Sequence, residues 1–263
     1  MKIPMYQVDA FAGRVFSGNP AAICPLESWL PAEQMQAIAA ENNLAETAFF
    51  VKNGAGYKLR WFTPAVEVDL CGHATLASAY IILNDLTPGE RSVSFNSKSG
   101  TLTVTRDGDL YSLDFPARPP QACEPIASLA PALGGEPEKI LAARDYFVIY
   151  STEQELRALK PDMQALMKID RFAVIATAPA GEQSQNADFV SRFFAPAKGV
   201  PEDPVTGSAH CTLIPYWSKR LGKQKLHAFQ VSPRGGELWC EDRGDRVTIS
   251  GKAVRFFEGT IFV

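Results

Sequence analysis

The sequence of 263 residues contains no closely spaced pair of cysteines. Its five cysteines are far apart and odd in number: Cys24, Cys71, Cys123, Cys211 and Cys240. Disulfide-rich secreted domains and small zinc sites usually depend on paired cysteines, often spaced as Cys-x-x-Cys. The sequence therefore predicts free thiols in a reducing compartment.

Long apolar runs are also absent. The longest apolar stretch, residues 76–83, includes Ser78 and is much shorter than the roughly 18 residues that a membrane-spanning helix needs. Residues 1–9 contain no apolar segment typical of a secretory signal peptide. We therefore expect a cytoplasmic protein without membrane contact.

An excess of basic charge is the third feature that the sequence lacks. Lysine and arginine number 26 against 29 acidic residues, which gives a formal net charge of −3. Nucleic-acid-binding proteins usually carry a basic surface, and this composition does not provide one. Hydrophobic residues at 46% and charged residues at 21% are ordinary for a globular protein, so we expect one that acts on a small molecule.

Two segments of the chain resemble each other. Residues 60–74 and 192–209 both read arginine, two aromatic residues, a small residue, Pro-Ala, an acidic linker and then glycine, a polar residue and alanine. This repeat predicts two similar halves with the functional site between them. We place the halves at residues 1–116 and 117–263, joined at the proline-rich residues 116–125, with the last strand able to return to the first half.

Alternating apolar residues predict strands through most of the chain. The expected strands are residues 6–11, 21–24, 47–51, 57–62, a meander over 92–115, 146–150, 172–175, 189–194, 228–231, 246–250 and 254–263. The expected helices are residues 28–41, 72–83, 124–133 and 207–221, the last ending at Gly222. The predicted fold class is α+β, with a mixed sheet or barrel around a central helix in each half.

Each copy of the repeat leads into a helix that begins with glycine, Gly72 in the first and Gly207 in the second. The first turn of a helix has unpaired N–H groups and a partial positive charge, so it attracts anions. The next residues, His73 and Ser208, add a polar side chain to each helix start. Helix capping explains one such segment, whereas two related copies favour a binding site for a small carboxylate.

Three further residues are candidates for chemistry, each with a simpler explanation. Glu46 precedes an apolar strand, which would suit a general acid–base, although an acid at a strand end is often only solvated. Asp203 is either an anion stabilised by the start of the second helix or part of an Asp-Pro turn. Cys71 directly precedes a helix, so its thiol either has a lowered pKa and is reactive, or is buried and inert.

Together these motifs resemble the phenazine-biosynthesis isomerase-like family, which has the diaminopimelate epimerase-type fold. The resemblance rests on residues 18–20, 46–49, 71–75 and 202–209, which occur in the family's order and span nearly the whole chain. It implies two similar halves, each a barrel-like sheet around a helix, with the active site in the cleft between them. It also implies a homodimeric biosynthetic enzyme without a cofactor or a metal.

The resemblance assigns roles to individual residues. It places the proton-shuttling glutamate at Glu46 and the supporting catalytic residues at His73, Asp203 and Ser208. The backbone amides at the two helix starts would hold the carboxylate of the substrate. The expected substrate-binding residues are Asn19, Cys71, Gly72, Thr206 and Gly207.

The sequence departs from the wider superfamily in one respect. Epimerases of this fold use one cysteine at each helix start, but the second motif here has no thiol before its glycine, and Cys211 lies inside the helix. We therefore expect a cofactor-independent isomerase that moves a proton on a small unsaturated carboxylate, the class to which the dihydro-hydroxy-anthranilate of the phenazine branch belongs. The alternatives are a catalytically silent binding protein of the same fold and a Cys71-assisted epimerase.

Overall fold

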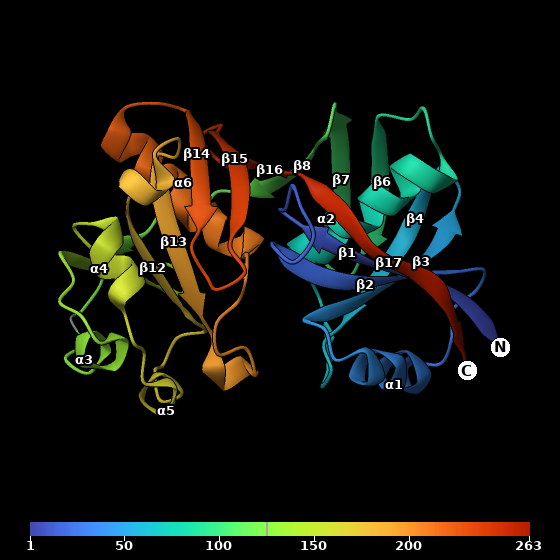
Figure 1. Ribbon diagram of the computed structural model, residues 1–263, viewed down its shortest axis with the longest axis horizontal. Coiled ribbons are helices and arrows are strands. Elements are labelled where there is room, and N and C mark those ends of the chain that lie inside the picture. Colours follow the sequence, from blue (N-terminus) through green and yellow to red (C-terminus); the bar gives the residue numbers. More distant parts are fainter. Residues whose placement is uncertain (125) are drawn as a thin grey trace. The chain divides into compact units, whose positions relative to one another are not determined.

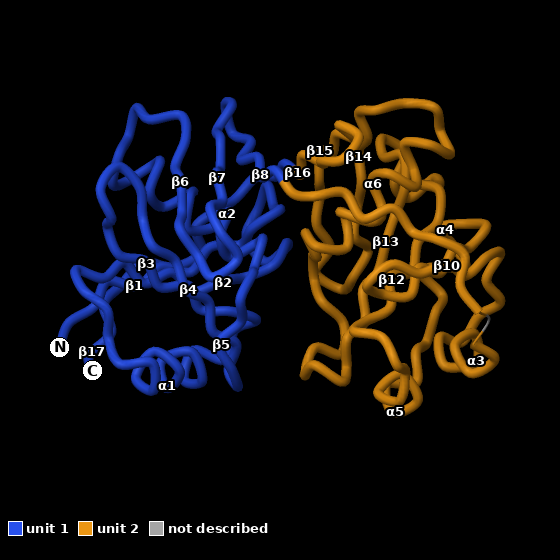
Figure 2. The backbone as a smooth tube through the Cα atoms, turned by 180° about the vertical axis from the view of Figure 1, so that it is seen from behind, with its two compact units in different colours: residues 1–114, 250–263 blue, residues 115–249 orange. Residues whose placement is uncertain are grey.

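The computed structural model describes residues 1–124 and 126–263, which form two compact units (Figure 2). Unit 1 comprises residues 1–114 and 250–263, and unit 2 comprises residues 115–249. Pro125, which ends the expected linker and falls within the helix expected from residue 124, lies outside the described residues. Within the described ranges, no helix is long and apolar enough to span a membrane.

Unit 1 is a mixed sheet with two helices (Figure 1). Its strands are β1 (Lys2–Ala10), β2 (Asn19–Leu26), β3 (Glu46–Asn53), β4 (Gly56–Phe62), β5 (Glu67–Val68), β6 (Ser92–Ser97), β7 (Gly100–Asp107), β8 (Leu110–Pro116, which continues into unit 2) and β17 (Ala253–Phe262). Its helices are α1 (Ala32–Asn42) and α2 (Gly72–Ile81), the latter extended by a π-helical turn, η1 (Ile82–Leu86). The C-terminal strand β17 pairs antiparallel with β1, so the two ends of the chain belong to one sheet.

Helix α2 is the central helix of unit 1. Eight of its ten residues are buried, and it contacts β1, β2 and β3. A helix that is apolar on all sides must be surrounded by the rest of the core. The curved sheet provides that surrounding, and a second cluster that includes Phe49 and Phe62 packs beneath α1.

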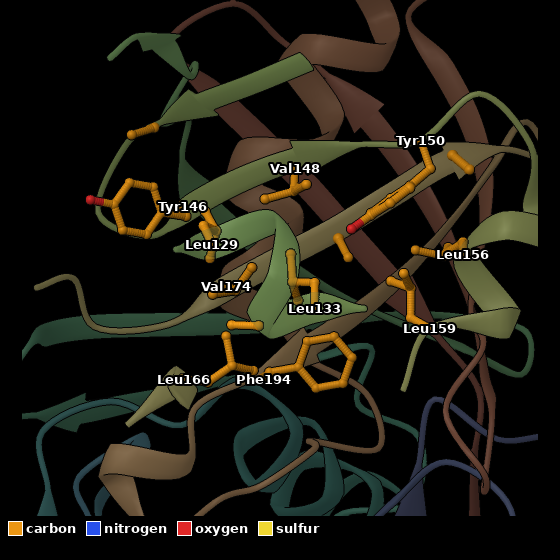
Figure 3. Packing of buried hydrophobic residues seen from close by; sticks show 14 of the residues in the cluster. Leu129, Leu133, Tyr146, Val148, Tyr150, Leu156, Leu159, Leu166, Val174 and Phe194 are labelled. Carbon is orange, nitrogen blue, oxygen red and sulfur yellow. The ribbon is translucent and has the colours of Figure 1, made fainter. Parts of the chain in front are cut away.

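Unit 2 has the same organisation. Its strands are β9 (Gln121–Ala122), β10 (Lys139–Ala142), β11 (Tyr146–Ile149), β12 (Val174–Pro179), β13 (Phe189–Phe194), β14 (Lys225–Gln230), β15 (Gly236–Asp242) and β16 (Arg246–Gly251, which continues into unit 1). Its helices are α3 (Leu129–Leu133), α4 (Glu153–Ala158), α5 (Met163–Leu166) and α6 (Gly207–Leu221), with short 3₁₀ turns η2 (Glu182–Ser184) and η3 (Pro196–Lys198). Figure 3 shows the core between α3, α4 and the sheet, where Leu133, Tyr150, Leu156 and Phe194 pack together.

A series of four strand pairings is the same in both units. In unit 1, β2 and β3 are parallel, β3 and β4 antiparallel, β4 and β6 parallel, and β6 and β7 antiparallel. In unit 2, β11 to β15 repeat this series in the same order. The central helix follows the third strand of the series in both units, α2 after β4 and α6 after β13. The predicted α+β fold with two pseudo-symmetric halves is therefore confirmed.

Several helix boundaries differ from expectation. Helix α6 matches the prediction and ends at Gly222, whose φ of 68° is the left-handed conformation that glycine favours. Helix α1 begins at Ala32 and not at residue 28, because Pro31 has extended backbone angles and caps the helix from outside. The helix expected from residue 124 is confined in the described residues to Leu129–Leu133, and α4 was not expected at all. Thr152 and Glu155 form a capping box at the start of α4, so this helix did have a local sequence signal.

The repeated arginine has the same structural role in both units. Arg60 makes a bidentate ion pair with Glu67 at 2.7 and 2.9 Å, and Arg192 makes one with Glu202 at 2.8 and 2.9 Å. Each guanidinium also lies over the second aromatic ring of its motif, Phe62 at 5.2 Å in unit 1 and its counterpart in unit 2 at 4.9 Å. Each arginine–glutamate pair, called a clamp below, thus ties the acidic linker to the preceding strand. The linker then leads to the start of the central helix.

Replacing Glu67 with glutamine should destabilise the protein in a pH-dependent way. Arg60 lowers the pKa of Glu67 to about 2, from the ordinary value of 4.5 for a glutamate, so the ionised carboxylate stabilises the fold above pH 4.5 and loses this effect as the pH falls toward 2. We expect E67Q to lower the free energy of unfolding by about 2 kcal/mol at pH 7, as for a partly buried charged hydrogen bond, and by less at pH 3. Urea unfolding at both pH values measures the difference.

The matched control is Asp109→Asn. Asp109 forms its ion pair with Lys252 at the surface, where its side chain is 70% exposed, so its loss should change stability little. Equal stability of E67Q and the wild type at pH 7 would contradict the role assigned to the clamp.

Candidate active site

A carboxylate and an imidazole lie in contact at one end of the unit 1 core. Glu46 Oε2 is 3.0 Å from His73 Nε2, and the two side chains are 17% and 7% exposed. In the described part of the chain, no donor is aligned for a hydrogen bond to this buried oxygen. The contact is therefore a close carboxylate–imidazole pair, which becomes an ion pair when the imidazole is protonated.

Local backbone geometry brings these two residues together. Helix α1 ends at Asn43 in the left-handed conformation, with φ of 49°, and β3 begins three residues later at Glu46. His73 is the second residue of α2, which packs against β3. Glu46 is the first residue of its strand and His73 lies in the first turn of its helix, so both side chains lie at the ends of these elements.

Cys71 is the third member of this group. Its Sγ lies 3.5 Å from His73 Nδ1, and the residue is buried. Burial raises the pKa of the Cys71 thiol, and the nearby Glu46 carboxylate raises it further. Of the two alternatives for Cys71, the buried thiol fits this geometry better, because desolvation and the adjacent negative charge oppose the effect of the helix end.

His73 is the positive partner of the group. Burial alone would lower the pKa of its imidazole, but the neighbouring Cys71 and Glu46 raise it and prevail, so the pKa lies well above 6.5. The positively charged form of the imidazole is therefore favoured beside Glu46.

Unit 2 holds the second group of predicted residues. The hydroxyl of Thr206 donates to Asp203 Oδ2, and the backbone N–H of Thr206 donates to Gln230 Oε1 at 2.8 Å. Gln230 also donates through Nε2 to the Asp203 carbonyl at 2.7 Å and to Thr206 Oγ1 at 3.1 Å. Gln230 is 1% exposed, and these hydrogen bonds hold the loop that leads into α6. Sequence analysis missed Gln230 because it lies at the end of β14, 24 residues from Thr206.

Arg144 is a second residue that the sequence did not indicate. Its Nη2 donates to Ser208 Oγ at 3.3 Å, and it pairs with the buried Asp145 at 3.0 Å while lying over the ring of Phe172 at 4.5 Å. The Arg144 side chain is 36% exposed. A guanidinium beside the start of α6 adds to the positive end of the helix, so this position suits an anion.

The remaining predicted residues occupy the helix starts and one strand. Gly72 and Gly207 are the first residues of α2 and α6, preceded by the extended residues Cys71 and Thr206. Neither preceding side chain accepts a hydrogen bond from its helix, so side-chain capping does not explain these motifs. Asn19 is fully buried at the start of β2, opposite Ala10.

The structure thus brings the predicted residues together in two groups. Asn19, Glu46 and residues 71–73 belong to unit 1, whereas Asp203 and residues 206–208 belong to unit 2. The two groups start from corresponding positions of the repeat. That both serve one substrate stays a prediction.

Comparison with known proteins identifies the family. Residues 8–259 match the family described as phenazine biosynthesis-like protein. The chain belongs to this family. An uncharacterized isomerase of Pseudomonas aeruginosa is 50% identical over 261 residues, which cover 99% of both chains. The family assignment and these relatives identify the protein as an isomerase.

Solved structures agree with the fold. A phenazine biosynthesis protein of the PhzF family from Enterococcus faecalis has a TM-score of 0.96 and 48% identity, with 100% of both chains covered. A hydroxyproline epimerase from Agrobacterium vitis has a TM-score of 0.59 at 10% identity, with 99% of this chain and 91% of that chain covered. The second likeness shows a shared fold alone.

The Cys71 thiol should resist alkylation in the folded protein. Because its pKa is raised and its side chain is buried, little reactive thiolate exists at pH 7.5. We expect iodoacetamide to label the partly exposed Cys123 at least about tenfold faster than Cys71, as measured by mass spectrometry of peptides. Urea-unfolded protein, in which all five cysteines should react, is the control. Preferential labelling of Cys71 in the folded state would restore the reactive-thiol interpretation.

Proposed function

We propose that the protein is a cofactor-independent isomerase in which Glu46 removes a proton from a small unsaturated carboxylate and returns it to another carbon. The observation that carries this proposal is the 3.0 Å contact between Glu46 and His73 in a nearly buried position. Proton transfer from carbon needs a base that is close to the substrate and shielded from water, and this arrangement supplies one.

The two residues would have complementary roles. Glu46 Oε2 accepts the proton, and the electron pair of the broken C–H bond moves into the conjugated system of the substrate. The imidazolium of His73 stabilises the negative charge that develops there and keeps the carboxylate in place. Transfer of the proton from Glu46 to a second carbon, with return of the electron pair to form the new C–H bond, completes the isomerisation without a net change in charge.

Recognition of the substrate carboxylate would rest on the helix starts. The first-turn amides of α2 and α6 have no side-chain cap, and Arg144 adds a cation at Ser208. Asp203, held by Thr206 and Gln230, would position a polar group of the substrate. These features support an anionic, partly polar substrate of the class represented by dihydro-hydroxy-anthranilate.

The neutral state of Cys71 argues against a thiol-based epimerase. A thiol with a raised pKa holds its proton at neutral pH, so little of the thiolate that an epimerase base requires is present. Cys71 would therefore shape the site beside His73, and the carboxylate would act as the base.

Glu46→Gln should abolish proton exchange while leaving the fold intact. NMR in D₂O would follow deuterium uptake into dihydro-hydroxy-anthranilate and a panel of unsaturated and amino carboxylates. We expect uptake into one compound by the wild type and a loss of about 10²–10⁴-fold in E46Q, the usual contribution of a general base. The matched control is Glu41→Gln on α1, an exposed acid whose replacement should leave the rate unchanged.

Ligand binding separates the proposal from its main alternative. An isomerase should keep measurable affinity for its substrate in E46Q, because the helix starts are unchanged. Binding without exchange in the wild type, unaffected by E46Q, would instead identify a catalytically silent binding protein.

A further inference from the structure

Three different metal-ligating atoms converge at the start of α2. Cys71 Sγ, one ring nitrogen of His73 and a carboxylate oxygen of Glu46 lie within 4.8 Å of one another. In the described ranges, 1–124 and 126–263, this is the one group of its kind that combines three such residues. Proton transfer uses the carboxylate and the imidazole, but it does not require a sulfur atom in the same place.

Two of the three distances between these atoms are close to those of a tetrahedral zinc site, and the third pair lies within 4.8 Å. His73 Nε2 lies 3.9 Å from Cys71 Sγ and 3.0 Å from Glu46 Oε2. Zinc bonds of about 2.0–2.3 Å at tetrahedral angles place neighbouring ligand atoms roughly 3.4–3.6 Å apart. Shifts of a few tenths of an ångström would therefore bring the two pairs that involve His73 to zinc-site distances.

The chemistry of the donors selects the metal. Magnesium and calcium prefer oxygen ligands, whereas a thiol, an imidazole and a carboxylate together suit zinc. Three protein ligands leave a fourth position open, as in catalytic and inhibitory zinc sites. Zinc would replace the contact between Glu46 Oε2 and His73 Nε2 and would displace the protons of the imidazole and the thiol, so its binding should strengthen as the pH rises.

The backbone already holds the sulfur ligand in place. The Cys71 carbonyl accepts a hydrogen bond from the backbone N–H of Thr75 at 3.2 Å and another from its hydroxyl at 2.5 Å. His73 is fixed two residues later within the same helical turn. A metal site built on one helix turn and one strand end needs little reorganisation to bind.

We propose that Glu46, Cys71 and His73 bind one zinc ion, and that zinc bound there reversibly inhibits the isomerase. The inhibition rests on the proposed function, because the metal occupies the carboxylate oxygen and the imidazole nitrogen that proton transfer needs. The binding itself does not depend on that function.

The test of binding uses the full chain and has a readout independent of activity. Cobalt(II), a spectroscopic substitute for zinc, should give one equivalent of binding with a sulfur-to-metal charge-transfer band, which excess zinc removes. Cys71→Ser should abolish the band, and both Cys71→Ser and Glu46→Gln should weaken zinc binding by about tenfold or more in a competition with a chromophoric chelator. Circular dichroism would establish that both variants are folded.

Two matched controls make the test specific. His227 and Glu237 form a similar histidine–carboxylate pair at 2.8 Å, and Cys123 is the most exposed thiol. His227→Gln and Cys123→Ser should bind zinc as tightly as the wild type. Two results would overturn the proposal. One is loss of the cobalt charge-transfer band in Cys123→Ser, and the other is a wild-type zinc affinity no higher than that of Cys71→Ser.

Activity is measured separately. Zinc should inhibit wild-type proton exchange, and removal of the metal by EDTA should restore it. A normal cobalt band in a protein without any exchange activity would contradict the proposed function and leave the metal site standing. Full activity at saturating zinc would overturn the inhibitory role.

Discussion

A largely buried central helix constrains each half of this protein. Eight of the ten residues of α2 are buried, and nine residues of α6 are buried along its length. Such a helix must be wrapped by a curved sheet, and the matching strand pairings of the two units provide this wrapping. The backbone polar groups of such a helix are then accessible to a ligand only at its ends. The helix starts are therefore the positions where a binding or catalytic site can form.

The candidate site follows from that constraint. The linkers that lead into the two helices are tied to the sheets by Arg60 with Glu67 and by Arg192 with Glu202. At the start of α2, His73 meets Glu46 in surroundings that water barely reaches, where charges interact strongly. Stability and function therefore depend on the same feature, the anchored start of a buried helix.

Much of this could be predicted from the sequence because the determinants are local or repeated. Strand alternation, the glycine that ends α6 and the repeated arginine motif are short-range signals, and the motifs around Glu46 and His73 indicated the family. Gln230 and Arg144 could not be predicted, because their partners Thr206 and Ser208 lie 24 and 64 residues away and only the folded sheet brings them near. The direction of the Cys71 pKa shift could not be predicted from the local sequence either. The helix start favours a thiolate, whereas burial and the Glu46 carboxylate oppose it.

The measurement that tests the central claim most directly is an NMR titration of the His73 imidazole in the wild type and in E46Q. The claim is that Glu46 and His73 hold one proton together as an ion pair. Long-range ¹H–¹⁵N spectra, assigned with His73→Gln, report the charge of the ring. The account predicts that the His73 ring stays charged well above pH 6.5 in the wild type and loses its proton at a lower pH in E46Q. Titration of His73 at the same pH in both proteins would contradict the account.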